Sequence, residues 1–104
     1  MTKVRATVFG SKIGYKGDNL YNGYYYGELS TNPEAEEEDL DYAALGKHPY
    51  KYRIKITYGK KSVIAYKADI GRGGVEFKPQ IDLHKKVADA LGFSGRGIVE
   101  IVAV

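Results

Sequence analysis

Alternating apolar and polar residues along the chain predict a mostly β protein. Residues 3–9 and 52–58 alternate most regularly and are typical of half-buried strands. Residues 62–68 follow the second of these segments after Gly59-Lys60-Lys61, which predicts a β-hairpin. Residues 98–104 form a nearly continuous apolar run, which suggests a strand inside a barrel. The first and last strands are both in a position to pair, so we expect a small barrel.

One segment has helical periodicity instead. Leu83, Val87, Ala90 and Leu91 fall on one face of a helix over residues 83–91, and Gly92 supplies a C-terminal stop. Asp82 directly precedes this segment, where an aspartate is a common N-cap. We therefore expect a single short helix late in a strand-rich chain.

The segment 10–27 has many glycines and tyrosines, and we interpret it as a long loop with a short strand at 24–26. Tyr15, Tyr24 and Tyr25 are candidates for stacking against sugar rings. The alternative is that they simply pack over one end of the barrel. Residues 30–41 predict an acidic loop with at most one helical turn. A calcium site is an alternative role for its acidic residues, but the loop lacks the alternating oxygen ligands of an EF-hand.

The composition narrows the choice of protein classes. The 104 residues form one domain, 1–104, which contains no cysteine and no apolar run of 18 residues. The net charge is +3, but six acids lie in 34–41, whereas residues 42–104 carry twelve Lys/Arg against five Asp/Glu. A basic body suits an anionic partner such as a cell-wall polysaccharide, a nucleic acid or an acidic protein.

Two aspartates are candidate catalytic residues. Asp69 ends a β-rich segment before Ile70-Gly71-Arg72-Gly73-Gly74, and Asp82 lies at the expected start of the helix. Glycoside cleavage requires an acid whose pKa is raised and commonly a second carboxylate. The alternatives are that Asp82 is an ordinary N-cap and that Asp69 binds backbone amides of the following turn.

The same stretch resembles the core motif of the rare-lipoprotein-A (RlpA) family, V-x-D-R-G-P followed by I-D-L-S-x-x-A-A-x-x-L-G. The matching residues are 66–73 and 81–92. Near the N-terminus, Ala6-Thr7-Val8-Phe9-Gly10 is similar to the family's A-S-W-Y-G. Further along, Tyr42-Ala43-Ala44 is similar to the family's T-A-A, and residues 49–56 are similar to its P-F-G-T-x-V-x-V. The Asp69-Ile70-Gly71 form is similar to the variant in phage tail proteins that carry this domain.

The resemblance implies a six-stranded double-psi β-barrel with a polysaccharide groove across one face. Lytic transglycosylases, family-45 endoglucanases and expansins are relatives with this fold. The resemblance implies that Asp82 is the general acid and that Asp69 lines the groove, with Arg72, His84 and His48 as further substrate contacts. His84 is alternatively a solvated residue of the first helical turn.

Three departures from the family pattern argue against catalysis. Leu45 occupies the position of the family's histidine, and His48 lies three residues further on. Ile70 replaces the motif arginine, for which Arg72 is a substitute, and Val8-Phe9 replace the Trp-Tyr pair.

The sequence therefore predicts a module that binds cell-wall polysaccharide, most specifically peptidoglycan, with weak or lost cleavage activity. The alternatives are an active lytic transglycosylase, and a basic barrel that binds nucleic acid or protein or forms part of a phage tail. No cofactor or metal is expected, because two histidines 36 residues apart without cysteine give no metal-ligand spacing. The setting implied is extracellular, periplasmic or a phage virion, although the chain shows no signal peptide.

Overall fold

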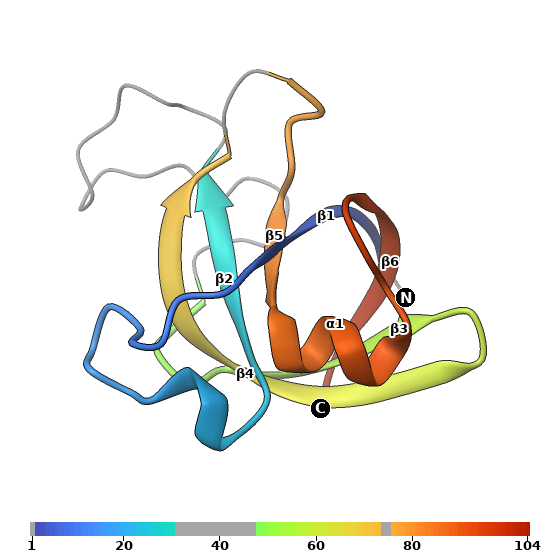
Figure 1. The fold of residues 1–104 in the computed structure, drawn as a ribbon. Helices are drawn as coiled ribbons and strands as arrows, with labels where there is room; N and C mark the ends of the chain where they lie inside the picture. The colour runs from blue at the N-terminus through green and yellow to red at the C-terminus, as the bar shows by residue number, and fades with distance from the viewer. Residues whose placement is uncertain (1, 31–47, 74–75) are drawn as a thin grey trace.

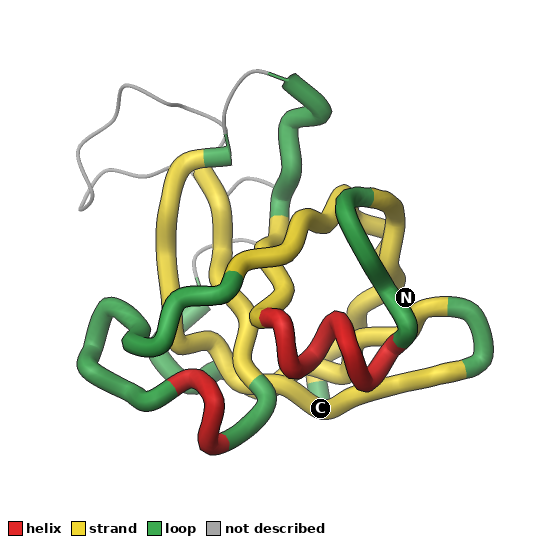
Figure 2. The backbone as a smooth tube through the Cα atoms, viewed as in Figure 1, coloured by secondary structure: helices red, strands yellow, loops and turns green. Residues whose placement is uncertain are grey.

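The computed structural model describes residues 2–30, 48–73 and 76–104, and within them the chain forms a barrel of six strands with one α-helix (Figure 1). A single 3-10 turn, η1, lies in the segment that joins the first two strands (Figure 2). The elements are β1 (Thr2–Phe9), η1 (Leu20–Asn22), β2 (Tyr25–Ser30), β3 (Arg53–Tyr58), β4 (Lys61–Arg72), β5 (Ile81–His84), α1 (Lys85–Leu91) and β6 (Gly97–Ala103).

The strands close into a ring in the order β1-β5-β2-β4-β3-β6. Two neighbouring pairs are parallel, β1 with β5 and β2 with β4, and the other four pairs are antiparallel. The first and last strands pair as the sequence predicts, with Thr2 opposite Ile101. The expected hairpin is also present, because Tyr58 pairs with Lys61 across Gly59, whose φ of 61° lies in the left-handed region.

Alternate strand residues fill the barrel interior, because successive side chains along a strand point to opposite faces of the sheet. Ile54 and Ile56 from β3 and Val99 and Ile101 from β6 are buried, which confirms the predicted inward faces of these strands. The helix α1 places Val87, Ala88 and Leu91 against the same core. Other members of this core are Val4, Ala6, Tyr26, Ala65, Ile81, Leu83 and Phe93.

Three element boundaries differ from the sequence prediction. The strand predicted over 24–26 extends to Ser30, so Gly27 lies inside β2 rather than in a loop. The strand β4 continues through Gly71 to Arg72, so no turn follows Asp69 directly. Residues 81–84 form a strand, and the helix begins at Lys85 rather than at residue 83. Backbone pairing with neighbouring strands therefore overrides the local turn and helix preferences.

The last strand also differs from expectation. Its nearly continuous apolar sequence suggested a strand inside the barrel, but Ile98 and Val102 are 49% and 40% exposed. The strand therefore alternates like the others and exposes apolar side chains on the outside of the barrel. The acidic loop was predicted over 30–41, but Ser30 is the last residue of β2. Residues 31–41 of that loop, Leu45 and Gly74 lie outside the described residues.

Among the described residues, no helix is long and apolar enough to cross a membrane.

Candidate functional site

A row of four paired residues crosses the wall of the barrel. Thr7 of β1 lies opposite Asp82 of β5, and Asp82 and Asp69 both lie opposite Gly27 of β2. Paired residues project to the same side of a sheet, and the neighbours Ala6, Leu83 and Ala68 are buried. The row therefore faces outward, and both carboxylates are half-buried.

Gly27 leaves the space between the two aspartates without a side chain. A Cβ placed at this position would lie 3.4 Å from the Cβ of Asp69. Because two strand spacings separate β5 from β4, the Cα atoms of the two aspartates lie about 10 Å apart in a regular sheet. The sequence prediction that Asp69 and Asp82 converge on one surface is therefore consistent with the strand register.

Asp82 is held in an environment that favours its protonated form. The pKa of Asp82 is raised to about 6: burial is the largest cause, a hydrogen bond from the Thr7 hydroxyl opposes the increase, and the negative charge of Asp69 adds to it. That hydrogen bond runs from Thr7 Oγ1 to Asp82 Oδ1 over 3.0 Å. A carboxyl group with this pKa retains a proton close to neutral pH, which is what a general acid requires.

The two simple structural roles considered for these aspartates are wrong. Asp82 does not cap the helix, because His84 occupies the N-cap position and accepts a hydrogen bond from the Lys86 backbone N–H. Asp69 does not precede a turn, because it lies within β4. Both carboxylates project from strands, and Thr7 is a partner that the sequence analysis did not identify.

The loop from Gly10 to Tyr24 covers β4 beside Asp69. The Tyr15 backbone N–H donates to the carbonyl of Ala68 over 3.2 Å, and buried Leu20 anchors the loop through η1. The loop approaches so closely at Gly14 that a Cβ there would lie 2.1 Å from the Ala68 carbonyl oxygen. A glycine is therefore required at this position to bring Tyr15 against the strand.

Tyr15 is the tyrosine most directly associated with the carboxylates. Its side chain is 40% exposed and makes an edge contact with the ring of Tyr50. Burial raises the pKa of Tyr15, and the negative charges of Glu28 and Asp69 raise it further.

The other two predicted tyrosines lie where β2 begins, Tyr24 directly before the strand and Tyr25 as its first residue. Tyr24 is 43% exposed, and the ammonium of Lys86 lies 5.6 Å from its ring centroid. Tyr25 is half-buried and pairs with Tyr66 of β4. Tyr15 and Tyr24 therefore present exposed aromatic surface that is suitable for stacking against sugars.

His84 does not have the role that the sequence suggested. It is fully buried, neither a solvated residue nor a surface available to a polysaccharide. Its Nε2 lies 3.0 Å from the Ser11 carbonyl oxygen, and its ring makes edge contacts with Phe9 and Tyr21. We therefore correct His84 to a residue that caps α1 and packs against the loop.

His48 lies beside a buried carboxylate that sequence reasoning missed. Its Nδ1 is 2.9 Å from Oε1 of Glu28, a side chain with no exposure. Lys67 Nζ lies 3.6 Å from Oε2 of the same carboxylate. Burial raises the pKa of Glu28, whereas Lys67 and His48 lower it. Local residue patterns contain little indication of this cluster, because Glu28 lies at the edge of a predicted loop.

Arg72, the candidate substitute for the motif arginine, is exposed at the end of β4 and pairs with Ser30. It lies three positions after Asp69, so alternation along a strand directs it to the other face of β4. The structure therefore separates Arg72 from the outward row of aspartates.

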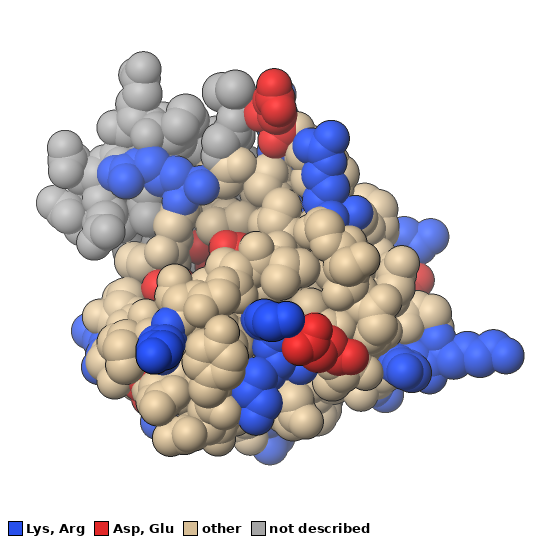
Figure 3. All heavy atoms as spheres, viewed as in Figure 1, with Lys and Arg blue, Asp and Glu red and all other residues tan. Residues whose placement is uncertain are grey.

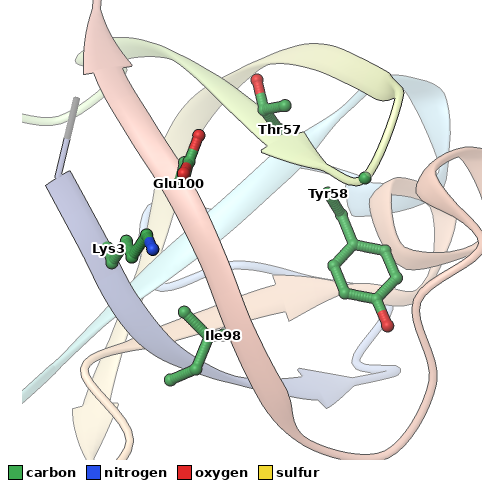
Figure 4. A pocket seen from close by; sticks show the side chains of 6 residues that line it. Lys3, Thr57, Tyr58, Ile98 and Glu100 are labelled. Carbon is green, nitrogen blue, oxygen red and sulfur yellow. The ribbon is translucent and has the colours of Figure 1, made fainter.

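An open pocket of about 510 Å³ lies elsewhere on the barrel (Figure 4). Its walls come from β1, β3 and β6, whereas Asp82 and Asp69 belong to β5 and β4. The lining side chains are Lys3, Thr57, Tyr58, Ile98 and Glu100, with Gly59 completing the wall. It contains only one carboxylate, so the row of aspartates is the better candidate for acid chemistry.

Within residues 2–30, 48–73 and 76–104, no group of three or more His, Cys, Asp and Glu side chains is arranged to hold a metal ion. The calcium alternative concerned residues 34–41, which lie outside the described part of the chain.

Comparison with known proteins establishes the fold. No family model matches the chain, and no curated protein sequence matches it significantly. Among solved structures, cerato-platanin 3 from M. perniciosa is similar, with a TM-score of 0.57 and 10% sequence identity. The similarity covers 99% of this chain and 94% of that chain. At this identity the similarity concerns the fold alone.

The closed mixed barrel and this structural similarity confirm the predicted fold class, a six-stranded double-psi β-barrel with one short helix. Fold and site together define the chain as a double-psi β-barrel domain that carries two carboxylates on its outer wall.

Proposed function

We propose that this domain binds a cell-wall polysaccharide, most specifically peptidoglycan, as an RlpA-like module. The observation that carries the proposal is the pair of aspartates on either side of Gly27, with Tyr15 beside them. Carboxylates accept hydrogen bonds from sugar hydroxyls, and an exposed tyrosine ring offers a stacking surface. The similarity to cerato-platanin 3 supports the fold and says nothing about which ligand this domain binds.

The charge distribution is consistent with an anionic glycan–peptide polymer. Figure 3 shows Lys and Arg side chains scattered over one face of the molecule, at its edge and near its centre, with fewer Asp and Glu side chains among them. Lys16 and Lys86 each lie within 6 Å of the ring of an exposed tyrosine, so a sugar bound there would also meet positive charge. At the two aspartates a glycan is favoured over a nucleic acid, because neutral sugar hydroxyls donate hydrogen bonds to carboxylates, whereas every nucleotide would bring a phosphate charge that they repel.

Binding is tested by co-sedimentation with purified, insoluble peptidoglycan. We expect retention at low salt, weaker retention at high salt, and substantial loss when Tyr15 and Tyr24 are both replaced by Ala. Tyr58→Ala is the matched control, because Tyr58 is equally exposed but lies on β3, at the pocket away from the aspartates. A folded wild-type protein that stays in the supernatant at low salt would rule out the proposal.

Glycan cleavage is a second candidate function, favoured by one observation. Asp82 combines a pKa of about 6 with a neighbouring carboxylate, which is the arrangement of acid catalysis on glycosides. Asp82→Asn retains the shape and the hydrogen bond from Thr7 but delivers no proton. Mass spectrometry of digested peptidoglycan compares the wild type with Asp82→Asn and Asp69→Asn.

Because the motif arginine and histidine are both replaced, we expect no product from the wild type together with retained binding. Product formed equally by the wild type and Asp82→Asn would contradict the assignment of Asp82 as the acid. The setting that accompanies this function is the cell exterior, the periplasm or a phage virion.

A further inference from the structure

A second row of paired residues crosses the other side of the ring, away from the aspartates. Lys3 of β1 lies opposite Glu100 of β6, and Glu100 in turn lies opposite Thr57 of β3. Val99 and Ile101, on either side of Glu100, are buried, so the row faces outward. All three residues of the row line the open pocket of about 510 Å³ (Figure 4).

Two exposed apolar side chains add to the walls of this pocket. Ile98 lies two positions before Glu100 and therefore on the same face of β6. Tyr58, at the end of β3, makes an edge contact with the buried ring of Phe93, with centroids 5.0 Å apart and an interplanar angle of 84°. This contact restricts the orientation of the Tyr58 ring. In Figure 4, Ile98 lies between Lys3 and that ring, so the pocket combines charged groups with apolar surface.

The two charged groups of the pocket do not neutralise each other. In the part of the chain that the structure describes, neither Lys3 nor Glu100 forms a salt bridge, although they are paired across β1 and β6. Directly opposite residues of an antiparallel sheet have Cβ atoms about 4.5–5.5 Å apart. A ligand that binds both groups must therefore carry a cation and an anion close together.

We propose that this pocket binds a free α-amino acid with an apolar side chain. The carboxylate of Glu100 accepts hydrogen bonds from the α-ammonium group, and Lys3 donates to the α-carboxylate. Tyr58 and Ile98 contact the apolar side chain of the ligand. The pocket volume lies within the range of about 300–1,000 Å³ that is usual for small-molecule sites.

The lining discriminates against the other ligand classes considered for this chain. A neutral sugar would use neither charge, and a nucleic acid has no ammonium group for Glu100. None of the residues that line the pocket belongs to the row of Thr7, Asp82, Gly27 and Asp69. The inference therefore goes beyond the proposed glycan binding and does not depend on it.

The site is tested by adding L-phenylalanine to ¹⁵N-labelled protein at pH 6 and recording ¹H–¹⁵N correlation spectra. We expect saturable shifts of the amides of Lys3, Gly59 and Glu100 and none at Gly27. The expected dissociation constant is on the order of 1 mM, because a small ligand gains little free energy in an open site. Absence of shifts at the pocket with about 10 mM phenylalanine would overturn the proposal.

Two blocked compounds test whether both charges of the ligand are used. Phenylalaninamide lacks the carboxylate, and N-acetylphenylalanine lacks the ammonium group. Each should bind about tenfold more weakly than phenylalanine, because each loses a charge-assisted hydrogen bond. An affinity within twofold of that of phenylalanine for either compound would overturn the proposal.

Two variants assign the charges to their residues. Lys3→Gln should bind phenylalanine and phenylalaninamide equally, and Glu100→Gln should bind phenylalanine and N-acetylphenylalanine equally. Lys55→Gln is the matched control, because Lys55 is exposed on β3 but does not line the pocket, and it should keep the wild-type preferences. A preference for the carboxylate that survives Lys3→Gln, or for the ammonium group that survives Glu100→Gln, would overturn the assigned contacts.

Discussion

At the scale of single residues, the row formed by Thr7, Asp82, Gly27 and Asp69 places two carboxylates where their charges interact. This arrangement destabilises the ionised form of Asp82, because burial and the charge of Asp69 both raise its pKa. A half-buried acid whose ionised form is disfavoured lowers the stability of the fold at neutral pH. Such a cost is common at sites selected for function rather than for stability.

Asp82→Asn should therefore stabilise the protein at pH 7–8. The folded pKa of about 6 exceeds the ordinary aspartate pKa of 3.8, so the folded protein holds this proton more tightly than the unfolded chain. The stabilisation that results is complete below about pH 4 and is lost as the pH rises through 6. We expect a gain of about 1–2 kcal/mol at pH 8, within the limit of about 3 kcal/mol that the full difference in pKa implies.

Urea denaturation of both proteins at pH 4 and pH 8 measures this effect. Asp89→Asn is the control, because Asp89 is exposed on α1 and pairs only weakly with Lys85 at 3.6 Å. A loss of stability for Asp82→Asn at pH 8 would show that Asp82 is stabilised as an anion.

Residue patterns predicted the two aspartates but not their partners. Asp69 and Asp82 stand out because each adjoins a recognisable strand or helix pattern in the sequence. Glu28 was missed because it lay beside a predicted loop, and Lys67 because it belongs to an otherwise ordinary predicted strand. Only the ring order places both beside His48. Pairing between β2 and β4 is not encoded in any local pattern of either segment.

At the scale of elements, the junction of β5 and α1 is organised by His84. Its Nδ1 accepts from the Lys86 N–H at the start of the helix, and its buried ring packs between Phe9 and Tyr21. One side chain therefore joins the helix, the first strand and the tyrosine-rich loop. The sequence pattern located the helix but placed its start two residues too early, because Leu83 is apolar in either a strand or a helix.

His84→Ala should cost about 3 kcal/mol, since it removes both the cap and a fully buried ring. His84→Asn should recover about 1 kcal/mol of this loss, because asparagine caps well but does not fill the space. Thermal and urea unfolding compare these variants with Lys85→Ala, which changes an exposed residue of the same helix. Equal losses for the alanine and asparagine variants would show that the cap contributes nothing.

At the scale of the whole molecule, alternation alone predicted the inward residues of β3 correctly and those of β6 in part. Ile56 and Ile101 pair across the two strands and are 0% and 7% exposed. The apolar sequence of β6 gave no sign that Ile98 and Val102 face outward, because an apolar residue is compatible with either face.

Ile56→Ala and Ile101→Ala should each reduce the free energy of unfolding by about 2–4 kcal/mol, since each leaves a cavity in the core. Val102→Ala, on the outer face of the same strand as Ile101, should change it by less than about 0.5 kcal/mol. Chemical denaturation measures the free energy of unfolding of all three variants. A larger effect for Val102→Ala than for Ile101→Ala would indicate that the outer face of β6 is covered.

The position of β1 between β5 and β6 has a consequence for how the protein acquires its site. Thr7 and Asp82 are separated by 75 positions in the chain, and both neighbours of β1 come from the last quarter of the sequence. Closing so long a loop is entropically costly, and folds rich in such contacts form in milliseconds to seconds rather than microseconds. During synthesis on the ribosome, β1 has no pairing partner until β5 and β6 have emerged. The hydrogen bond from Thr7 to Asp82 therefore forms only when the ring closes, after the strands that carry the two aspartates have been made.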